Sequence, residues 1–245
     1  MLPTTVVLNA DQTIIVEHEL HFTMVDGKVC SALSSYQSSQ RCYICGASPK
    51  QMNNTPDMTG REVDATMLKF GLSPLHAWIR CFECLLHIAY RLDVNKWQIR
   101  DEKDKKLVEE RKKNIQDRFR EEMGLLVDMP KQSSGNTNDG NTARRFFREA
   151  SISTNITGID INIINRLRVI LETLSCGCAI NIKAFGMYAG ETRELYLNKY
   201  SWYYMPVTLH KLLVHGEDAI GHCIIPIGQL SEEAQEARNK DNRRF

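Results

Sequence analysis

The chain has 245 residues, 42% of them hydrophobic, which is enough to bury one sizeable core or two small ones. Its 31 lysines and arginines nearly balance its 30 acidic residues, which excludes a strongly basic field over the whole chain and leaves nucleic-acid contact to local basic patches. No stretch approaches the roughly 18 apolar residues of a membrane helix, so no membrane partner is expected.

The first predicted element is a β-strand over residues 14–24. Apolar residues share its even positions: Val16, Leu20, Phe22 and Met24. Polar residues stand opposite them, and this period of two is typical of a strand. Asp26 also stands at an even position, on the side of the apolar residues. Asp26-Gly27 is however a common turn dipeptide, so an aspartate in a turn is the simpler interpretation.

A loop and then a long helix are expected next. Residues 47–60 have a loop composition, and Ser73 and Pro74 then supply the N-cap and first residue of the helix LHAWIRCFECLLHIAYRL. Its apolar residues recur at intervals of three and four: Trp78, Cys81, Leu85 and Ile88. This spacing predicts one buried helix face.

The second half of the chain also predicts helices. A charged amphipathic helix over 102–123 has a stripe of Leu107, Ile115 and Phe119 and stops at Gly124, before a glycine-containing flexible loop. Three more helices are expected: one capped by Asp160 and ending near Gly177, one from about Asn181 to Tyr200, and one carrying HKLLVH from Pro206 to Gly216. The last segment, 231–245, is rich in helix formers.

Eight cysteines without a secretory signal pattern favour the cytosol or nucleus. Of three close pairs, only Cys42 and Cys45 have the surroundings of a zinc knuckle, because a glycine follows CYIC and permits a tight turn. Cys81 and Cys84 lie on the apolar helix stripe and are expected to be packed thiols. Cys176 and Cys178 are interpreted as helix-end residues.

His210 and His215 are the best candidates for the other half of a zinc site, because His-x4-His falls within the spacing of tetrahedral sites. Five residues turn a helix by about 500°, which leaves the two rings about 140° apart. Both can face one ion only if the helix ends or bends between them, and Gly216 marks such an end. The alternative is two unrelated histidines on a surface helix.

Taken in order, these motifs resemble Transib-type DNA transposases, a family related to the catalytic subunit of the V(D)J recombinase. The resemblance rests on the motifs Asp26-Gly-Lys-Val, Cys42-Tyr-Ile-Cys45, His210-Lys-Leu-Leu-Val-His215 and the segment SEEAQEARNK from residue 231. It also covers LSPLHAWIRCFECLLH, DRFREEMGLLVDMPK, NDGNTARRFF and WYYMP, and therefore nearly the whole chain.

The resemblance implies a mainly α fold with a short β element: an incomplete ribonuclease-H-like core with an Asp, Asp, Glu triad, interrupted by a helical zinc-binding insertion. Residues 1–41 would end the catalytic sheet, 42–215 would form the insertion, and 216–245 the carboxy-terminal catalytic helix region. Structural Zn²⁺ would be held by Cys42, Cys45, His210 and His215, pinning the ends of the insertion together.

The catalytic residues implied by the resemblance are Asp26 and Glu233, with Glu232 and Glu236 as alternatives to the latter. In this chemistry two Mg²⁺ or Mn²⁺ ions about 3.5–4 Å apart activate the nucleophile and stabilise the leaving oxygen of a phosphodiester. The chain starts too late to contain the family's first Asp, and Asp11 shows none of the surrounding pattern. The triad is therefore incomplete.

DNA contact is expected at the start of the helix that follows the flexible loop. Asn141, Arg144, Arg145 and Arg148 cluster there, and arginines and helix N-termini both suit phosphate oxygens. By resemblance the segment would lie against DNA near the cleavage site, whereas a solvated basic turn is the alternative. The Lys112-Lys113 run is interpreted as an ordinary exposed helix face.

Two functions are therefore expected as alternatives. The first is a fragment of a cut-and-paste transposase that is inactive alone because the first catalytic Asp is missing. The second is a domesticated zinc-containing module that binds DNA or oligomerises without catalysis. The resemblance implies a nuclear location, with double-stranded DNA at transposon ends and a second copy or a related transposase as partners.

Overall fold

A computed structural model describes residues 4–9, 12–16, 27–34, 36, 38–58, 60–131 and 135–230. The long helices are α4 (Pro74–Tyr90), α5 (Glu102–Met123), α8 (Ile161–Ser175) and α9 (Ile182–Tyr200). The shorter α-helices are α1 (Gly27–Leu33), α2 (Pro49–Met52), α3 (Thr55–Met58), α6 (Gly140–Arg148), α7 (Ala150–Thr157), α10 (Val207–Val214) and α11 (Gly216–Gly221). Two 3₁₀ helices are η1 (Ala65–Phe70) and η2 (Ile227–Leu230).

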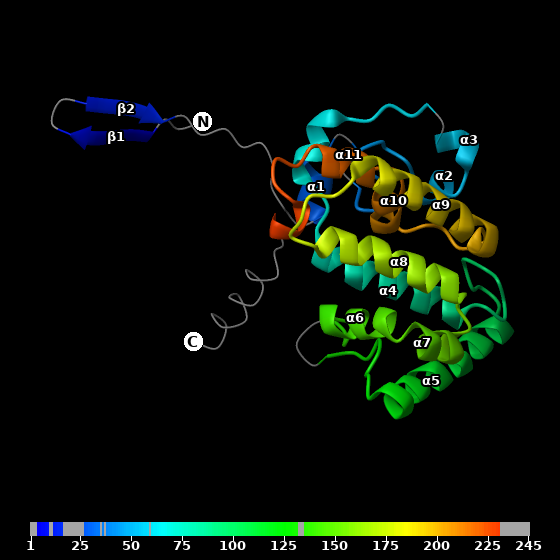
Figure 1. Cartoon of the computed structure of the whole chain (residues 1–245). Helices are drawn as coiled ribbons and strands as arrows, with labels where there is room; N and C mark the ends of the chain where they lie inside the picture. Colours follow the sequence, from blue (N-terminus) through cyan, green and yellow to red (C-terminus); the bar gives the residue numbers. More distant parts are fainter. Residues whose placement is uncertain are drawn as a thin grey trace.

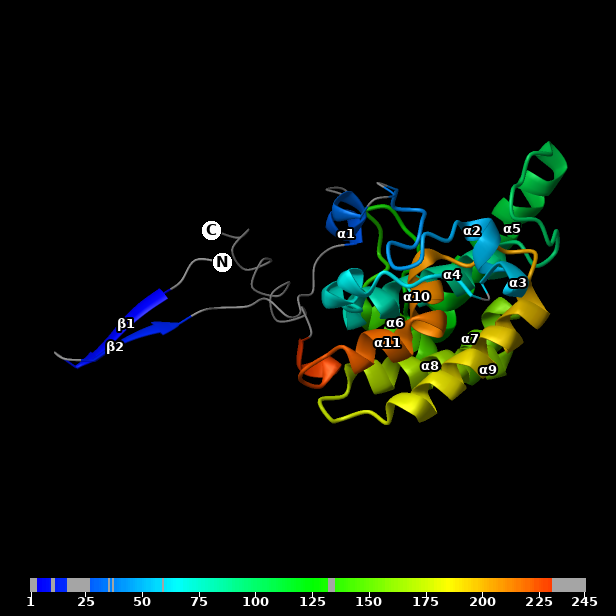
Figure 2. The same ribbon diagram turned by 90° about the horizontal axis from the view of Figure 1, so that it is seen from above.

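Helix α4 lies at the centre of the helical body. It contacts α5, α6 and α7 on one side and α10 on the other, with α8 running alongside it (Figures 1 and 2). The predicted stripe is buried throughout: Trp78, Cys81, Leu85 and Ile88. Because burying each large apolar side chain contributes roughly 1.5–3 kcal/mol, this central helix organises the core.

The predicted helix boundaries are confirmed by the capping contacts. The Ser73 hydroxyl accepts the N–H of His76, the Asp160 carboxylate accepts that of Asn162, and the Asn181 side chain accepts that of Ala184. Gly124 ends α5 in the left-handed conformation, at φ +62°. These contacts satisfy backbone groups that helix ends leave without intrahelical partners.

Two local expectations differ from the structure. Residues 47–60 contain the short helices α2 and α3, because Ser48 and Pro49 start a helical turn in which the Gln51 side chain accepts from the Ser48 N–H. Leu107, expected on the buried stripe of α5, is exposed, whereas Ile115 and Phe119 are buried. The first half of α5 therefore contacts the core through the partly buried Val108, and the second half buries Ile115 and Phe119.

The expectation of a ribonuclease-H-like core is wrong for the described residues. Their only strands are β1 (Thr4–Asn9) and β2 (Gln12–Val16), which form a two-stranded antiparallel hairpin. A ribonuclease-H-like fold needs a central sheet of several strands covered by helices. The predicted strand over 14–24 overlaps β2 at its start, and residues 17–26 lie outside the described part. The mainly helical character is confirmed.

Helices α9, α10 and α11 form the layer that carries the second half of the candidate site. Helix α10 packs between α4 and α9, and α11 contacts α9 (Figure 1). Leu209, Leu212 and Leu213 anchor α10 in the core. In the described part of the chain, no helix combines the length and apolarity required to cross a bilayer.

Candidate metal centre

The first half of the centre is a tight turn at Cys42-Tyr-Ile-Cys45. The Cys42 N–H donates to the Ala47 carbonyl at 3.0 Å, and the Gly46 N–H donates to the Cys42 carbonyl at 2.8 Å. Gly46 has φ +68°, which a residue with a Cβ rarely adopts. The turn is thus the knuckle that the glycine after CYIC predicts.

The second half comes from α10 and its C-terminal end. His210 lies inside the helix, which ends at Val214, and His215 is the C-cap with φ −109° and ψ 5°. The helix therefore ends between the two histidines, as required for both rings to face one point. The ring centroids are 5.0 Å apart and the rings are nearly perpendicular, at 82°.

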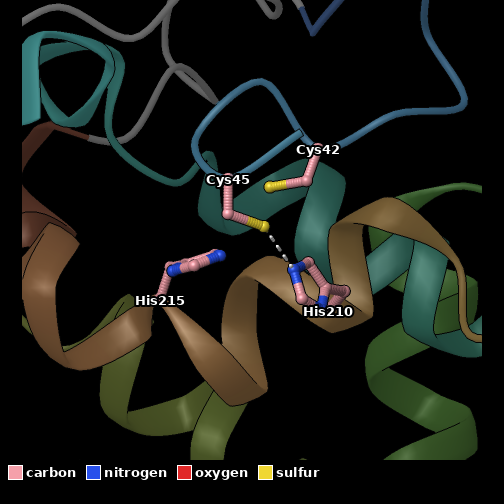
Figure 3. A group of neighbouring side chains, drawn as sticks. All are labelled: Cys42, Cys45, His210 and His215. Atoms are coloured by element: carbon pink, nitrogen blue, oxygen red, sulfur yellow. Dashed lines mark hydrogen bonds between the residues drawn. The ribbon is translucent and has the colours of Figure 1, made fainter. Parts of the chain in front are cut away.

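The fold brings all four predicted ligands together. One ligand atom from each of Cys42, Cys45, His210 and His215 lies within 4.8 Å of every other, and none of the four residues is more than 5% exposed. Figure 3 shows the side chains converging from the knuckle and from α10, with Cys45 Sγ 3.4 Å from His210 Nε2. Residues 165 positions apart thus form one buried cluster that could hold a metal such as zinc.

The two thiols differ in their ionisation. The hydrogen bond with Cys45 and then burial raise the pKa of Cys42. The same hydrogen bond is the largest cause lowering the pKa of Cys45; burial opposes it, and the nearby imidazoles of His210 and His215 lower the pKa further. Burial lowers the pKa of His210, which favours its neutral form. Cys45 thiolate and neutral imidazole are the forms that bind metals.

The donor set fits zinc. Two thiol sulfurs and two imidazole nitrogens form the Cys2His2 combination of closed, tetrahedral structural sites. His215 Nε2 is buried and has no hydrogen-bond partner among the described residues, so an ion would satisfy an otherwise orphaned atom. No carboxylate belongs to the cluster, and soft sulfur ligands do not suit Mg²⁺ or Mn²⁺.

Tyr43 and Lys211, each next to a ligand in sequence, also lie together. The Lys211 ammonium donates to the Tyr43 hydroxyl at 3.3 Å and lies 4.3 Å from the centroid of its ring. Burial lowers the pKa of Lys211, while nearby Cys42 and Cys30 oppose this shift. The sequence analysis did not single out this pair, although each residue directly follows a proposed ligand, which could have drawn attention to it.

The other two close cysteine pairs lie where the sequence predicts. Cys81 and Cys84 are fully packed in α4, and burial is the main cause that raises the pKa of each thiol. Cys176 is the C-cap of α8, and Cys178 is exposed just beyond it. Within the described residues, no second group of three or more such side chains could hold an ion.

The predicted catalytic residues Asp26 and Glu233 lie outside the described residues, as do Asp11, Glu232 and Glu236. The predicted magnesium or manganese site therefore has no described ligand.

The four residues predicted to contact DNA lie on α6 but have different surroundings. The Arg144 guanidinium lies 5.5 Å from the Trp78 ring centroid, and Arg145 donates to the Met123 carbonyl at 2.5 Å. The Arg148 side chain is 70% exposed and lies 3.6 Å from the Glu149 carboxylate. Asn141 is exposed. Asn141, Arg145 and Arg148 are therefore exposed, whereas Arg144 is half-buried; Arg144 and Arg145 also contact residues outside α6.

The chain matches no protein-family model, and no curated protein matches its sequence.

Proposed function

We propose that the described helical body is a structural zinc domain, in which one Zn²⁺ is held by Cys42, Cys45, His210 and His215. The observation that carries this proposal is the convergence of four buried ligand atoms of the right chemistry within 4.8 Å. Closed sites of this composition stabilise folds, whereas catalytic zinc keeps a coordination position for water or substrate.

The ion would join two segments that the local backbone does not connect. The knuckle belongs to the stretch before η1, and the histidines belong to α10, which contacts α4 and α9. Holding the ends of so long a loop together has a large entropic cost, which metal binding would offset. Zinc would therefore fix the position of the knuckle on the helical body.

For the biological role, we propose a transposase-related module that binds double-stranded DNA without catalysing its cleavage. The ordered motifs of the Transib-type family support the relationship, and the exposed side chain of Arg148 supports a phosphate contact. A nuclear location, and pairing with a second copy or with a related transposase, follow from the same proposal.

Two measurements on the purified chain test these proposals separately. Metal analysis of the protein after extensive dialysis tests the zinc domain, and titration of a random-sequence DNA duplex at several salt concentrations tests the binding module. We expect bound zinc and affinity that falls steeply with salt. If the protein contains zinc but does not bind DNA, the proposal of a structural zinc domain stands and the proposed DNA-binding role is rejected.

A further inference from the structure

A cavity of about 510 Å³ lies beside the candidate metal centre. It is lined by the knuckle residue Tyr43, by the first turns of α4, by Trp97 and Tyr204, and by the first turns of α10 including Lys211. Its volume is within the range of about 300–1,000 Å³ typical of small-molecule sites.

The charged side chains of the cavity are cationic. Lys211 and Arg80 line it, and none of its lining residues is Asp or Glu. Arg80 pairs with Glu83 at 2.7 Å, so its charge is partly offset. Lys211, in contrast, pairs with no carboxylate of the described residues, its polar contact being the Tyr43 hydroxyl. An anionic oxygen in the cavity would therefore find an ammonium group that is not already paired with a carboxylate.

Helix α10 adds donors to the same wall. Its N-cap is Pro206, which makes no side-chain cap, and Pro206, Val207 and Thr208 all line the cavity. The first N–H groups of a helix have no intrahelical acceptor, and the helix dipole favours negative charge beside them. The wall that carries Lys211 thus also carries uncapped backbone donors, which is a typical setting for an anionic oxygen.

The remaining surface suits a flat apolar group. Tyr43, Trp97 and Tyr204 line the cavity, and the Trp97 and Tyr204 rings pack against each other with centroids 5.0 Å apart. Aromatic faces bind planar rings by stacking, and Trp97 and Tyr204 are the partly exposed rings of the cavity. The Tyr43 ring is only 3% exposed and lies under the Lys211 ammonium, so it offers no free face. A ligand with both an aromatic ring and an anionic group would use the whole cavity.

We infer that this cavity binds a small planar organic anion, such as a nucleoside monophosphate, with Lys211 and the first turn of α10 facing the anionic group and Trp97 and Tyr204 facing the ring. This site goes beyond the proposed DNA-binding role, because it takes a free small molecule and uses none of the arginines of α6.

The test is calorimetric titration of the full-length, zinc-loaded protein with adenosine monophosphate at low salt. We expect saturable binding that weakens about tenfold in Lys211→Met, since a hydrogen bond to a charged group is lost. Adenosine and inorganic phosphate, titrated separately, should each bind more weakly than the nucleotide. Lys112→Met is the matched control, because Lys112 also lies over a tyrosine ring, Tyr90, but outside the cavity.

Because Lys211 is next to a proposed zinc ligand, zinc content is measured for every variant. Trp97→Leu provides a second test at a position remote in sequence from the ligands, and we expect it to weaken nucleotide binding while zinc is retained. Failure of the nucleotide to bind at millimolar concentration, or an unchanged affinity in both Lys211→Met and Trp97→Leu, would overturn the inference. Phosphate binding as tightly as the nucleotide would overturn the role assigned to the aromatic residues.

Discussion

Cys45 and His210 are 165 positions apart in the chain, yet their Sγ and Nε2 atoms lie 3.4 Å apart in a buried cluster. One residue belongs to a glycine-dependent turn and the other to a short helix anchored in the core. The closeness of these two atoms depends on the packing of α10 against α4 and α9, and a metal held between them would tie the knuckle to the helical body.

Metal removal should lower thermal stability. If zinc fixes the knuckle on the helical body, chelation leaves four buried polar groups without their ligand and releases the long loop. We expect the Tm to fall by about 10 °C or more, because each 1 kcal/mol lost corresponds to roughly 2–4 °C for a protein of this size. The measurement is a thermal melt with and without a zinc chelator, and re-addition of zinc should restore the Tm. Identical melts would contradict a structural role for the ion.

Gly46→Ala should destabilise the knuckle. The substitution costs roughly 1–2 kcal/mol because Gly46 is in the left-handed region, at φ +68°, and the added Cβ would also overlap the Tyr36 ring. Gly124→Ala is the matched control, since Gly124 has φ +62° but no neighbouring atom near its Cβ position. Chemical denaturation of both variants measures the difference. A cost for Gly46→Ala no greater than that for Gly124→Ala would remove the steric part of this explanation.

The sequence was sufficient to predict most long helices and where they begin and end, because these depend on local chemistry. The side chains of Ser73, Asp160 and Asn181 accept hydrogen bonds from backbone N–H groups two or three residues further along the chain. Gly124 ends its helix because it adopts a positive φ. The contact between Cys45 and His210, in contrast, does not follow from neighbouring residues in the sequence. Spacing left two unrelated surface histidines as an alternative, and only the resemblance to a family paired the two halves.

The errors have physical causes as well. Residues 47–60 look polar and contain turn formers, but Ser48 and Pro49 suffice to start a short helix against the core. The catalytic sheet was expected from the family resemblance, whereas the sequence pattern itself predicted only one strand, and alternation specifies a strand without specifying its partners. The cavity beside Lys211 could not be predicted, because its walls come from four separate parts of the chain.

Arg148 and Arg145 should have separable effects. Arg148→Ala should flatten the slope of log affinity against log salt by about one for a DNA duplex and leave stability unchanged, since its side chain is 70% exposed. Arg145→Ala should cost about 1 kcal/mol of stability, because its guanidinium donates to the Met123 carbonyl. Salt titrations and denaturation curves measure the two effects, with Lys113→Ala as an exposed control. An unchanged slope for Arg148→Ala would show that Arg148 does not contact the DNA backbone.

The cap of α8 should make a pH-dependent contribution to stability. Partial burial raises the pKa of Asp160, but the Lys199 ammonium and the N–H groups of Asn162 and Ile163 outweigh burial, so the net pKa is lowered. A carboxylate with a lowered pKa stabilises the fold above its unfolded-state value of 3.8, and this contribution disappears as pH falls through the folded pKa.

Asp160→Ala should therefore cost about 1 kcal/mol near neutral pH, the usual effect of losing an N-cap. Asp160→Asn keeps a capping oxygen and should cost less. Urea denaturation across a pH series measures the difference between the wild type and Asp160→Ala, which should shrink in acid. A difference that grows in acid would show that the carboxylate stabilises the helix by some other means.

The most direct test of the zinc domain is the metal content of four purified proteins, measured by mass spectrometry after dialysis against metal-free buffer: the wild type, Cys45→Ala, His210→Ala and Cys178→Ser. We predict one zinc per chain in the wild type and in Cys178→Ser, whose thiol is exposed and remote from the cluster in sequence, and strong depletion in Cys45→Ala and His210→Ala. A wild type without zinc, or full retention of zinc by both ligand variants, would contradict the proposal that these residues form a structural zinc site.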